Sequence, residues 1–149
     1  MKKNVISKES RGVLSKTYGW IILVALVLLD AILDIIFAKG SGVQSGIWKP
    51  IANLLGVTNP LFLTPIVLII FYLVVKGGAW LTKKADKIDF YAEELVLTTL
   101  VIVYGVFVLW LISVYLFNFT LIKNQFYLIP ILIVIGIVYS WWAEKKLKR

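Results

Sequence analysis

The sequence predicts an all-α integral membrane protein with four transmembrane helices. Only 16% of its 149 residues are charged and 60% are hydrophobic, whereas charged residues make up about a quarter of a typical soluble domain. The mean hydropathy is +0.91, and the apolar residues fall into four runs that reach the roughly 17–25 residues of a bilayer-crossing helix. We expect the spans at residues 18–38, 61–81, 95–117 and 126–142, in a single membrane domain over residues 1–149.

The first span, residues 18–38, begins with Tyr18 and Trp20, which suit the aromatic belt at a membrane surface. Basic residues precede it, and the run from Gly19 to Leu29 has the length of a signal-peptide core. The apolar character resumes after this run, however, and no A-x-A cleavage pattern follows. The first span is therefore expected to stay in the protein as a transmembrane helix.

Between the first two spans, residues 39–59 become polar and glycine-rich before apolar residues return at helical spacing around Pro50. Proline is tolerated in the first turn of a helix, and Gly56 suits the position just after the last turn. We expect a short helix lying in the membrane interface, with an ordered loop as the alternative. Asn59 and Pro60 then open the second span.

Lysine and arginine are distributed unequally between the two sides of this four-span arrangement. The side with both termini and the connector at residues 82–94 carries thirteen of them, and the other side carries three, namely Lys39, Lys49 and Lys123. Because basic residues accumulate on the cytoplasmic side of membrane proteins, we predict a cell-membrane protein with both termini in the cytoplasm. The net charge of +8 is explained by this orientation. No nucleic-acid partner is expected, since such binding needs basic residues gathered on one folded face.

The connector at residues 82–94 is the most charged part of the chain, with acidic and basic residues interspersed. Such mixed charge is typical of a solvated connector, and we expect the neighbouring helices to extend into it. Its last two acids, Glu93 and Glu94, precede the third span and favour the positive end of a helix. Helix capping is expected of them rather than metal binding, because adjacent residues on a helix point away from each other.

Two acids, Asp30 and Asp34, interrupt the first span and are the main candidates for a functional site. Being four residues apart, they project from the same face of a helix, one turn from each other. A rise of about 1.5 Å per residue puts Asp30 beyond the bilayer midplane and Asp34 near the outer interface. An ionised acid near the bilayer centre costs about 2.5–3.5 kcal/mol on insertion scales, so both are expected to point into the protein.

Two interpretations of this acid pair stay open. The functional one is a proton or cation site, in which the carboxylates share a proton or hold a hard cation together with hydroxyls and carbonyls. Polar residues at comparable depth supply the further candidates: Asn59, Thr64, Ser113 and Tyr115. The structural interpretation has Asp34 reach the outer surface and pair with Lys39, while Asp30 is neutral or bonded to another helix or subunit.

Missing residue types exclude most membrane enzymes. The chain has no cysteine and no histidine, which removes disulfides, thiol chemistry, zinc and iron–sulfur sites and imidazole bases. We therefore expect a non-enzymatic protein with no catalytic residue, no metal and no cofactor. An enzyme acting on lipid is the unfavoured alternative, since only a carboxylate could act as its general base. Tyr104 and Trp110 could line a quinone or lipid groove, although such residues more often pack against helices or lipid.

The first half of the chain resembles a family of small prokaryotic multi-pass membrane proteins of unknown function. The shared features are Asp30-Ala31-Ile32-Leu33-Asp34 in the first span, Gly40 after it, Asn59-Pro60 at the start of the second span and Lys76 near its end. The loop is longer here than in that family, and the acid that usually precedes Asn-Pro is absent. The resemblance implies a fold and no particular activity.

On these grounds the sequence favours a non-enzymatic accessory or structural subunit of a membrane complex, because catalytic groups are lacking and the connectors are too short for a soluble domain. The expected partners are the lipid bilayer and other membrane subunits or further copies of the chain. The alternative is a proton- or cation-coupled transporter or channel that uses Asp30 and Asp34.

Overall fold

The computed structural model describes residues 12–37, 48–86, 91–122 and 124–148. In chain order its helices are α1 (Lys16–Phe37), α2 (Lys49–Leu55), α3 (Pro60–Asp86), α4 (Ala92–Phe117) and α5 (Gln125–Leu147). The described residues contain no strand, and α1, α3, α4 and α5 are each long and apolar enough to cross a membrane. The prediction of an all-α fold with four helices long and apolar enough to cross a membrane is confirmed.

Some of the long helices extend well beyond the predicted spans. α3 continues to Asp86, as the expected helical extension into the charged connector, and α5 continues to Leu147 among the charged residues near the C-terminus. Apolar length limits the part of a helix that lies in lipid, but the helical backbone hydrogen bonds can continue past it into water. Lys83 and Lys84 in the last turn of α3 also complement the negative end of the helix dipole.

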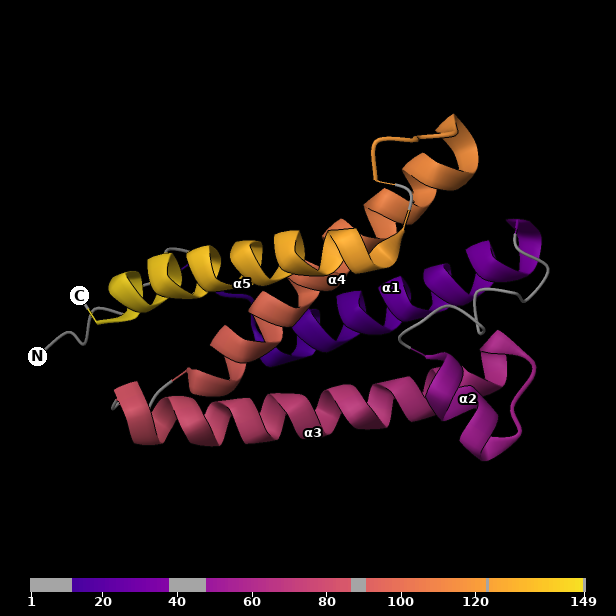
Figure 1. Ribbon diagram of the computed structural model, residues 1–149. Helices are drawn as coiled ribbons and strands as arrows, with labels where there is room; N and C mark the ends of the chain where they lie inside the picture. Colours follow the sequence, from indigo (N-terminus) through magenta and orange to yellow (C-terminus); the bar gives the residue numbers. More distant parts are fainter. Residues whose placement is uncertain (1–11, 38–47, 87–90, 123, 149) are drawn as a thin grey trace, which may run out of the picture.

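The helix at the centre of the bundle is α4. It packs against α1, α3 and α5, and α1 also packs against α3. In the ribbon diagram α4 crosses between α5 on one side and the α1–α3 pair on the other (Figure 1). The buried share of each helix agrees with this central position of α4. In α4, 39% of the apolar stretch is buried inside the protein, but in α5 only 22% is buried. α5 therefore presents most of its surface outward.

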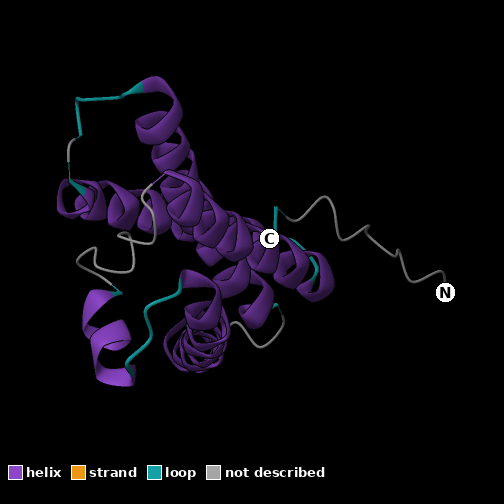
Figure 2. Ribbon diagram, turned by 90° about the vertical axis from the view of Figure 1, so that its right-hand side faces the viewer, coloured by secondary structure: helices purple, strands orange, loops and turns teal. Residues whose placement is uncertain are grey.

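The short helix α2 lies beside the start of α3 (Figure 1 and Figure 2). Pro50 falls in its first turn and Gly56 directly follows its last residue. Gly56 has a φ of +64°, a left-handed conformation that glycine adopts without steric cost, and its N–H donates to the carbonyl of Asn53 at 3.3 Å. The short helix and its end residues are confirmed, and its position in a membrane interface stays a prediction.

The two described ends of the chain, Gly12 and Lys148, lie at one end of the bundle, which we call the termini end (Figure 1). The hydroxyl of Tyr139 in α5 donates to the carbonyl of Gly12 at 2.5 Å, and the N–H of Leu14 donates to Thr98 Oγ1 of α4 at 2.9 Å. Residues 12–14 are thus held against α4 and α5. The opposite end of the bundle, which carries α2 and the turn between α4 and α5, is called the α2 end.

Glu93 joins three helices at the termini end. Its carboxylate lies 2.9 Å from Lys16 Nζ of α1 and 2.8 Å from Lys76 Nζ of α3. Glu93 does lie in the first turn of α4, as expected for a residue that favours the helix dipole, and the ion pairs are a further role that its position in the sequence does not reveal. Near the same end of α3, Lys84 Nζ lies over the ring of Trp80, 5.0 Å from its centroid.

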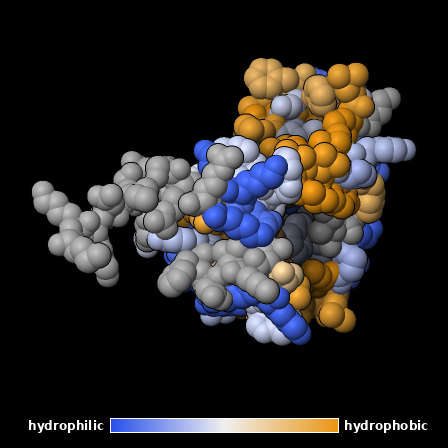
Figure 3. All heavy atoms as spheres, turned by 90° about the vertical axis from the view of Figure 1, so that its left-hand side faces the viewer, coloured by the Kyte–Doolittle hydropathy of each residue, from blue (hydrophilic) through white to orange (hydrophobic). Residues whose placement is uncertain are grey.

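The surface of the bundle matches a membrane environment. Viewed from the termini end, hydrophilic side chains gather in the middle and at the lower edge of the face, and apolar side chains dominate its upper part (Figure 3). Lys145 lies over the ring of Trp141 at 3.5 Å and Lys146 over that of Trp142 at 4.0 Å. Large apolar side chains are exposed on all four long helices, which is the surface that lipid chains cover.

Candidate functional site: an acidic cavity inside the bundle

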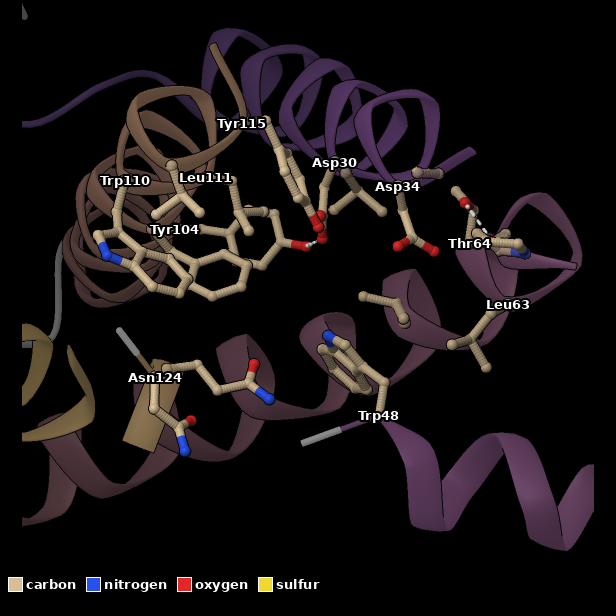
Figure 4. A pocket seen from close by; sticks show the side chains of 17 residues that line it. Asp30, Asp34, Trp48, Leu63, Thr64, Tyr104, Trp110, Leu111, Tyr115 and Asn124 are labelled. Atoms are coloured by element: carbon tan, nitrogen blue, oxygen red, sulfur yellow. Dashed lines mark hydrogen bonds between the residues drawn. The ribbon is translucent and has the colours of Figure 1, made fainter. Parts of the chain in front are cut away.

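A cavity of about 240 Å³ lies between α1, α3 and α4, near the α2 end of the bundle (Figure 4). Asp30 and Asp34 both line it, and their carboxylates point into it from α1 (Figure 4). Their shared direction follows from the four-residue spacing on a helix. Both acids therefore point toward the interior of the protein, as expected, and the cavity that they face is formed by helices of the same chain.

Asp30 is hydrogen-bonded to the central helix. The hydroxyl of Tyr104 in α4 donates to Asp30 Oδ2 at 2.5 Å, and Tyr104 is itself buried. Tyr115, eleven residues or about three turns further along α4, points its hydroxyl toward the acid pair (Figure 4). Asp34, one turn beyond Asp30, is only 6% exposed. The acid pair is therefore enclosed by groups of its own bundle, and the structure bears out the bond from Asp30 to another helix.

Aromatic rings form much of the remaining wall. Trp48, the residue before α2, contacts Phe71 with ring centroids 6.1 Å apart, and the series continues through Tyr104 and Phe107 to Trp110 at centroid distances of 5.2, 5.5 and 6.0 Å. All of these rings except Phe71 line the cavity directly. Because each ring packs on the next, the wall is held in place before any ligand arrives.

The polar groups opposite the acids are mostly engaged with backbone. The hydroxyl of Thr64 donates to the carbonyl of Pro60 at 3.3 Å, and Asn124 Oδ1 caps α5 by accepting from the N–H of Phe126 at 3.1 Å. The indole N–H of Trp110 donates to the carbonyl of Ile122 at 3.2 Å, which fixes the turn between α4 and α5. Among the described residues that line the cavity none is basic.

The structure brings together only part of the predicted site. Asp30, Asp34, Thr64 and Tyr115 line the cavity. Asn59 and Ser113 do not belong to its lining, and each serves its own helix: Asn59 Oδ1 accepts from the N–H of Leu61 at 3.0 Å, and Ser113 Oγ donates to the carbonyl of Leu109 at 2.9 Å. Lys39, the expected partner of Asp34 in the structural interpretation, falls outside the described residues.

Several residues that line the cavity could not be predicted from the sequence. Tyr104 and Trp110 are recognised as possible groove residues, and both line the cavity. Trp48, Phe107 and Gln125 are not, because they come from different elements and no spacing pattern links them to the acids. The position of α2 brings Trp48 to the cavity and the start of α5 brings Gln125, whereas Phe107 reaches it from α4, as Tyr104 does.

Four helices long and apolar enough to cross a membrane, with an acidic, aromatic-lined cavity between them, indicate a multi-pass α-helical membrane protein. No protein-family model, curated protein or solved structure matches the chain. The resemblance of its first half to a family of small prokaryotic membrane proteins gains no support from these comparisons. The function is therefore inferred from the chemistry of the cavity.

Proposed function

We propose that this protein is a proton- or cation-coupled membrane transporter or channel whose binding site contains Asp30 and Asp34. The observation that supports this most strongly is that both carboxylates line a cavity inside the bundle. Acids within a membrane are costly, and those that face a cavity typically mark an ion or substrate pathway. This observation shifts the preference from the accessory subunit that the sequence favours to the alternative.

The acid pair offers a simple basis for coupling. A proton and a cation each neutralise a carboxylate, so they compete for the same two groups. Binding of a cation then releases a proton, and protonation releases the cation. Asp30 is held in place by Tyr104, which keeps one carboxylate fixed while its neighbour lies one helical turn away.

For the orientation we propose that the termini end is cytoplasmic and the α2 end faces outward, as the thirteen-to-three distribution of Lys and Arg supports. Because the chain has no cysteine, single cysteines can be introduced without background. Leu121→Cys, at an 86% exposed position near the α2 end, should react with a membrane-impermeant maleimide in intact cells. Lys148→Cys should react only after permeabilisation, and the reverse pattern would invert the proposed orientation.

Asp30→Asn is expected to reduce cation or proton flux to the level of protein-free vesicles, because it removes the negative charge that the Tyr104 hydroxyl orients. Flux is measured in proteoliposomes with a trapped pH dye and a potassium diffusion potential, and with sodium, potassium or tetramethylammonium as test cations. Glu144→Gln is the matched control, since Glu144 is an acid outside the cavity. Unchanged flux in a folded Asp30→Asn protein would dismiss the site.

The accessory or structural subunit is the second candidate, and one observation favours it. A groove of about 610 Å³ on α4 and α5 is lined mainly by apolar side chains such as Val103, Leu132 and Ile133, a surface that a partner helix or a second copy could cover. Purification in mild detergent tests this candidate. A single monodisperse monomer with no co-purifying chain would count against it.

A further inference from the structure

The cavity near the α2 end combines two kinds of surface. Two carboxylates, Asp30 and Asp34, lie on one wall, and aromatic rings with aliphatic side chains cover most of the rest. The described part of this wall therefore offers two acids beside an aromatic and aliphatic surface, and none of its described residues is basic. The complementary ligand is therefore positively charged and has an apolar surface.

The donors of the cavity do not suit a bare metal ion. Calcium takes six to eight oxygen ligands at about 2.3–2.6 Å, and magnesium needs near-ideal octahedral geometry. Here the Thr64 hydroxyl, the Asn124 amide oxygen and the Tyr104 hydroxyl are engaged with Pro60, Phe126 and Asp30. Among the described residues no three Asp, Glu, His or Cys side chains gather as a metal-ligand set.

An organic cation fits the same surface better. Aromatic faces attract a cation whose charge is spread over methyl groups, and cages of such rings are a common means of recognising quaternary ammonium groups. Trp48, Phe107, Trp110 and Tyr115 line the cavity together with the two acids. The volume of about 240 Å³ lies below the roughly 300–1,000 Å³ of pockets for drug-sized ligands, so the ligand is small.

We propose that this cavity binds a small organic cation with a methylated ammonium group, held by the aromatic faces and by the charges of Asp30 and Asp34. The inference rests on the proposed transport function, for which it names the substrate class. The two carboxylates attract the positive charge of the ligand, and they can take up protons when the ligand leaves. The rings distinguish the organic cation from sodium or potassium, whose compact charge keeps its water.

Choline and its uncharged isostere 3,3-dimethylbutan-1-ol are the matched probes, because they have the same shape and differ in charge. Binding to the purified protein in lipid nanodiscs is measured by calorimetry, with sodium chloride as a further control. Choline should bind at least about tenfold more tightly than the alcohol. Equal affinities for the two probes, or no binding of choline, would overturn the inference.

Trp48→Leu and Tyr115→Leu test the aromatic wall. Each should weaken choline binding about 5- to 30-fold, and Trp48→Phe, which keeps a ring, should restore most of the affinity at that position. Trp80→Leu is the control, because Trp80 is 60% exposed and not a lining residue. Thermal unfolding shows whether each variant is folded. If the folded Leu variants bind choline as tightly as the unaltered protein does, the aromatic rings do not contribute to the site and the inference is wrong.

The binding and flux measurements separate the two proposals. Choline binding that is lost in Asp30→Asn, without flux of any test cation, would uphold the ligand class and refute transport. Flux of protons or sodium that depends on Asp30, without choline binding, would uphold transport and refute the ligand class. If the Asp30→Asn protein keeps both choline binding and cation flux, both proposals are refuted.

Discussion

Gly19→Val is expected to destabilise the bundle by several kcal/mol, because no side chain fits between α1 and α4 at this position. A Cβ on Gly19 would lie 2.6 Å from Leu97 Cδ2 and 2.9 Å from Leu97 Cγ. Leu97 is fully buried, so it can move aside only by displacing side chains packed around it. Adding even a methyl group to a well-packed core costs about 1–3 kcal/mol, and valine adds a branched side chain.

The chain provides a matched control for this change. Gly77 also lies inside a long helix, α3, but a Cβ there would meet no atom within 4 Å among the described residues. Gly77→Val should therefore unfold close to the temperature of the unaltered protein in the same detergent, followed by circular dichroism. Adding Leu97→Ala should recover part of the loss caused by Gly19→Val, since it removes the clashing atoms. Equal stabilities of the Gly19 and Gly77 variants would show that this helix contact is not tight.

The close contact at Gly19 illustrates what the sequence could and could not predict. Apolar length alone gives the four long helices, because a bilayer imposes a minimum span, and the special backbone requirements of Pro50 and Gly56 give α2. The order of packing, with α4 at the centre, has no such signature: in lipid the apolar residues that face other helices look the same as those that face acyl chains.

The candidate site was predictable to a similar degree. Asp30 and Asp34 stand out because a carboxylate in an apolar span has a cost that must be compensated. The compensating group does not stand out, since Tyr104 is one of seven tyrosines in the chain and only the packing of α1 on α4 brings its hydroxyl to Asp30. Asn59 and Ser113 share the expected depth but bond their own helices, because depth fixes the distance along the membrane normal and not the direction of a side chain.

Glu93→Lys is expected to lower the unfolding temperature markedly, because it places a third positive charge between Lys16 and Lys76. The carboxylate it removes lies 2.9 Å and 2.8 Å from the two ammonium groups. The new lysine also lies in the first turn of α4, where a positive charge opposes the helix dipole. Glu93→Gln should have a smaller effect, since it removes the attraction without adding repulsion. Thermal unfolding in detergent at low salt measures both.

Two further measurements identify the cause as electrostatic. Raising the salt concentration to about 1 M shortens the screening length to about 3 Å, so it should narrow the gap between the Glu93 variants and the unaltered protein. The charge exchange Glu93→Lys with Lys76→Glu should recover part of the stability, because a carboxylate again lies among the cations. Since Glu93 does not line the cavity, the folded fraction of each variant should bind choline normally. If the variants unfold at the same temperature as the unaltered protein at every salt concentration, the ion pairs of Glu93 do not stabilise the packing of α1, α3 and α4.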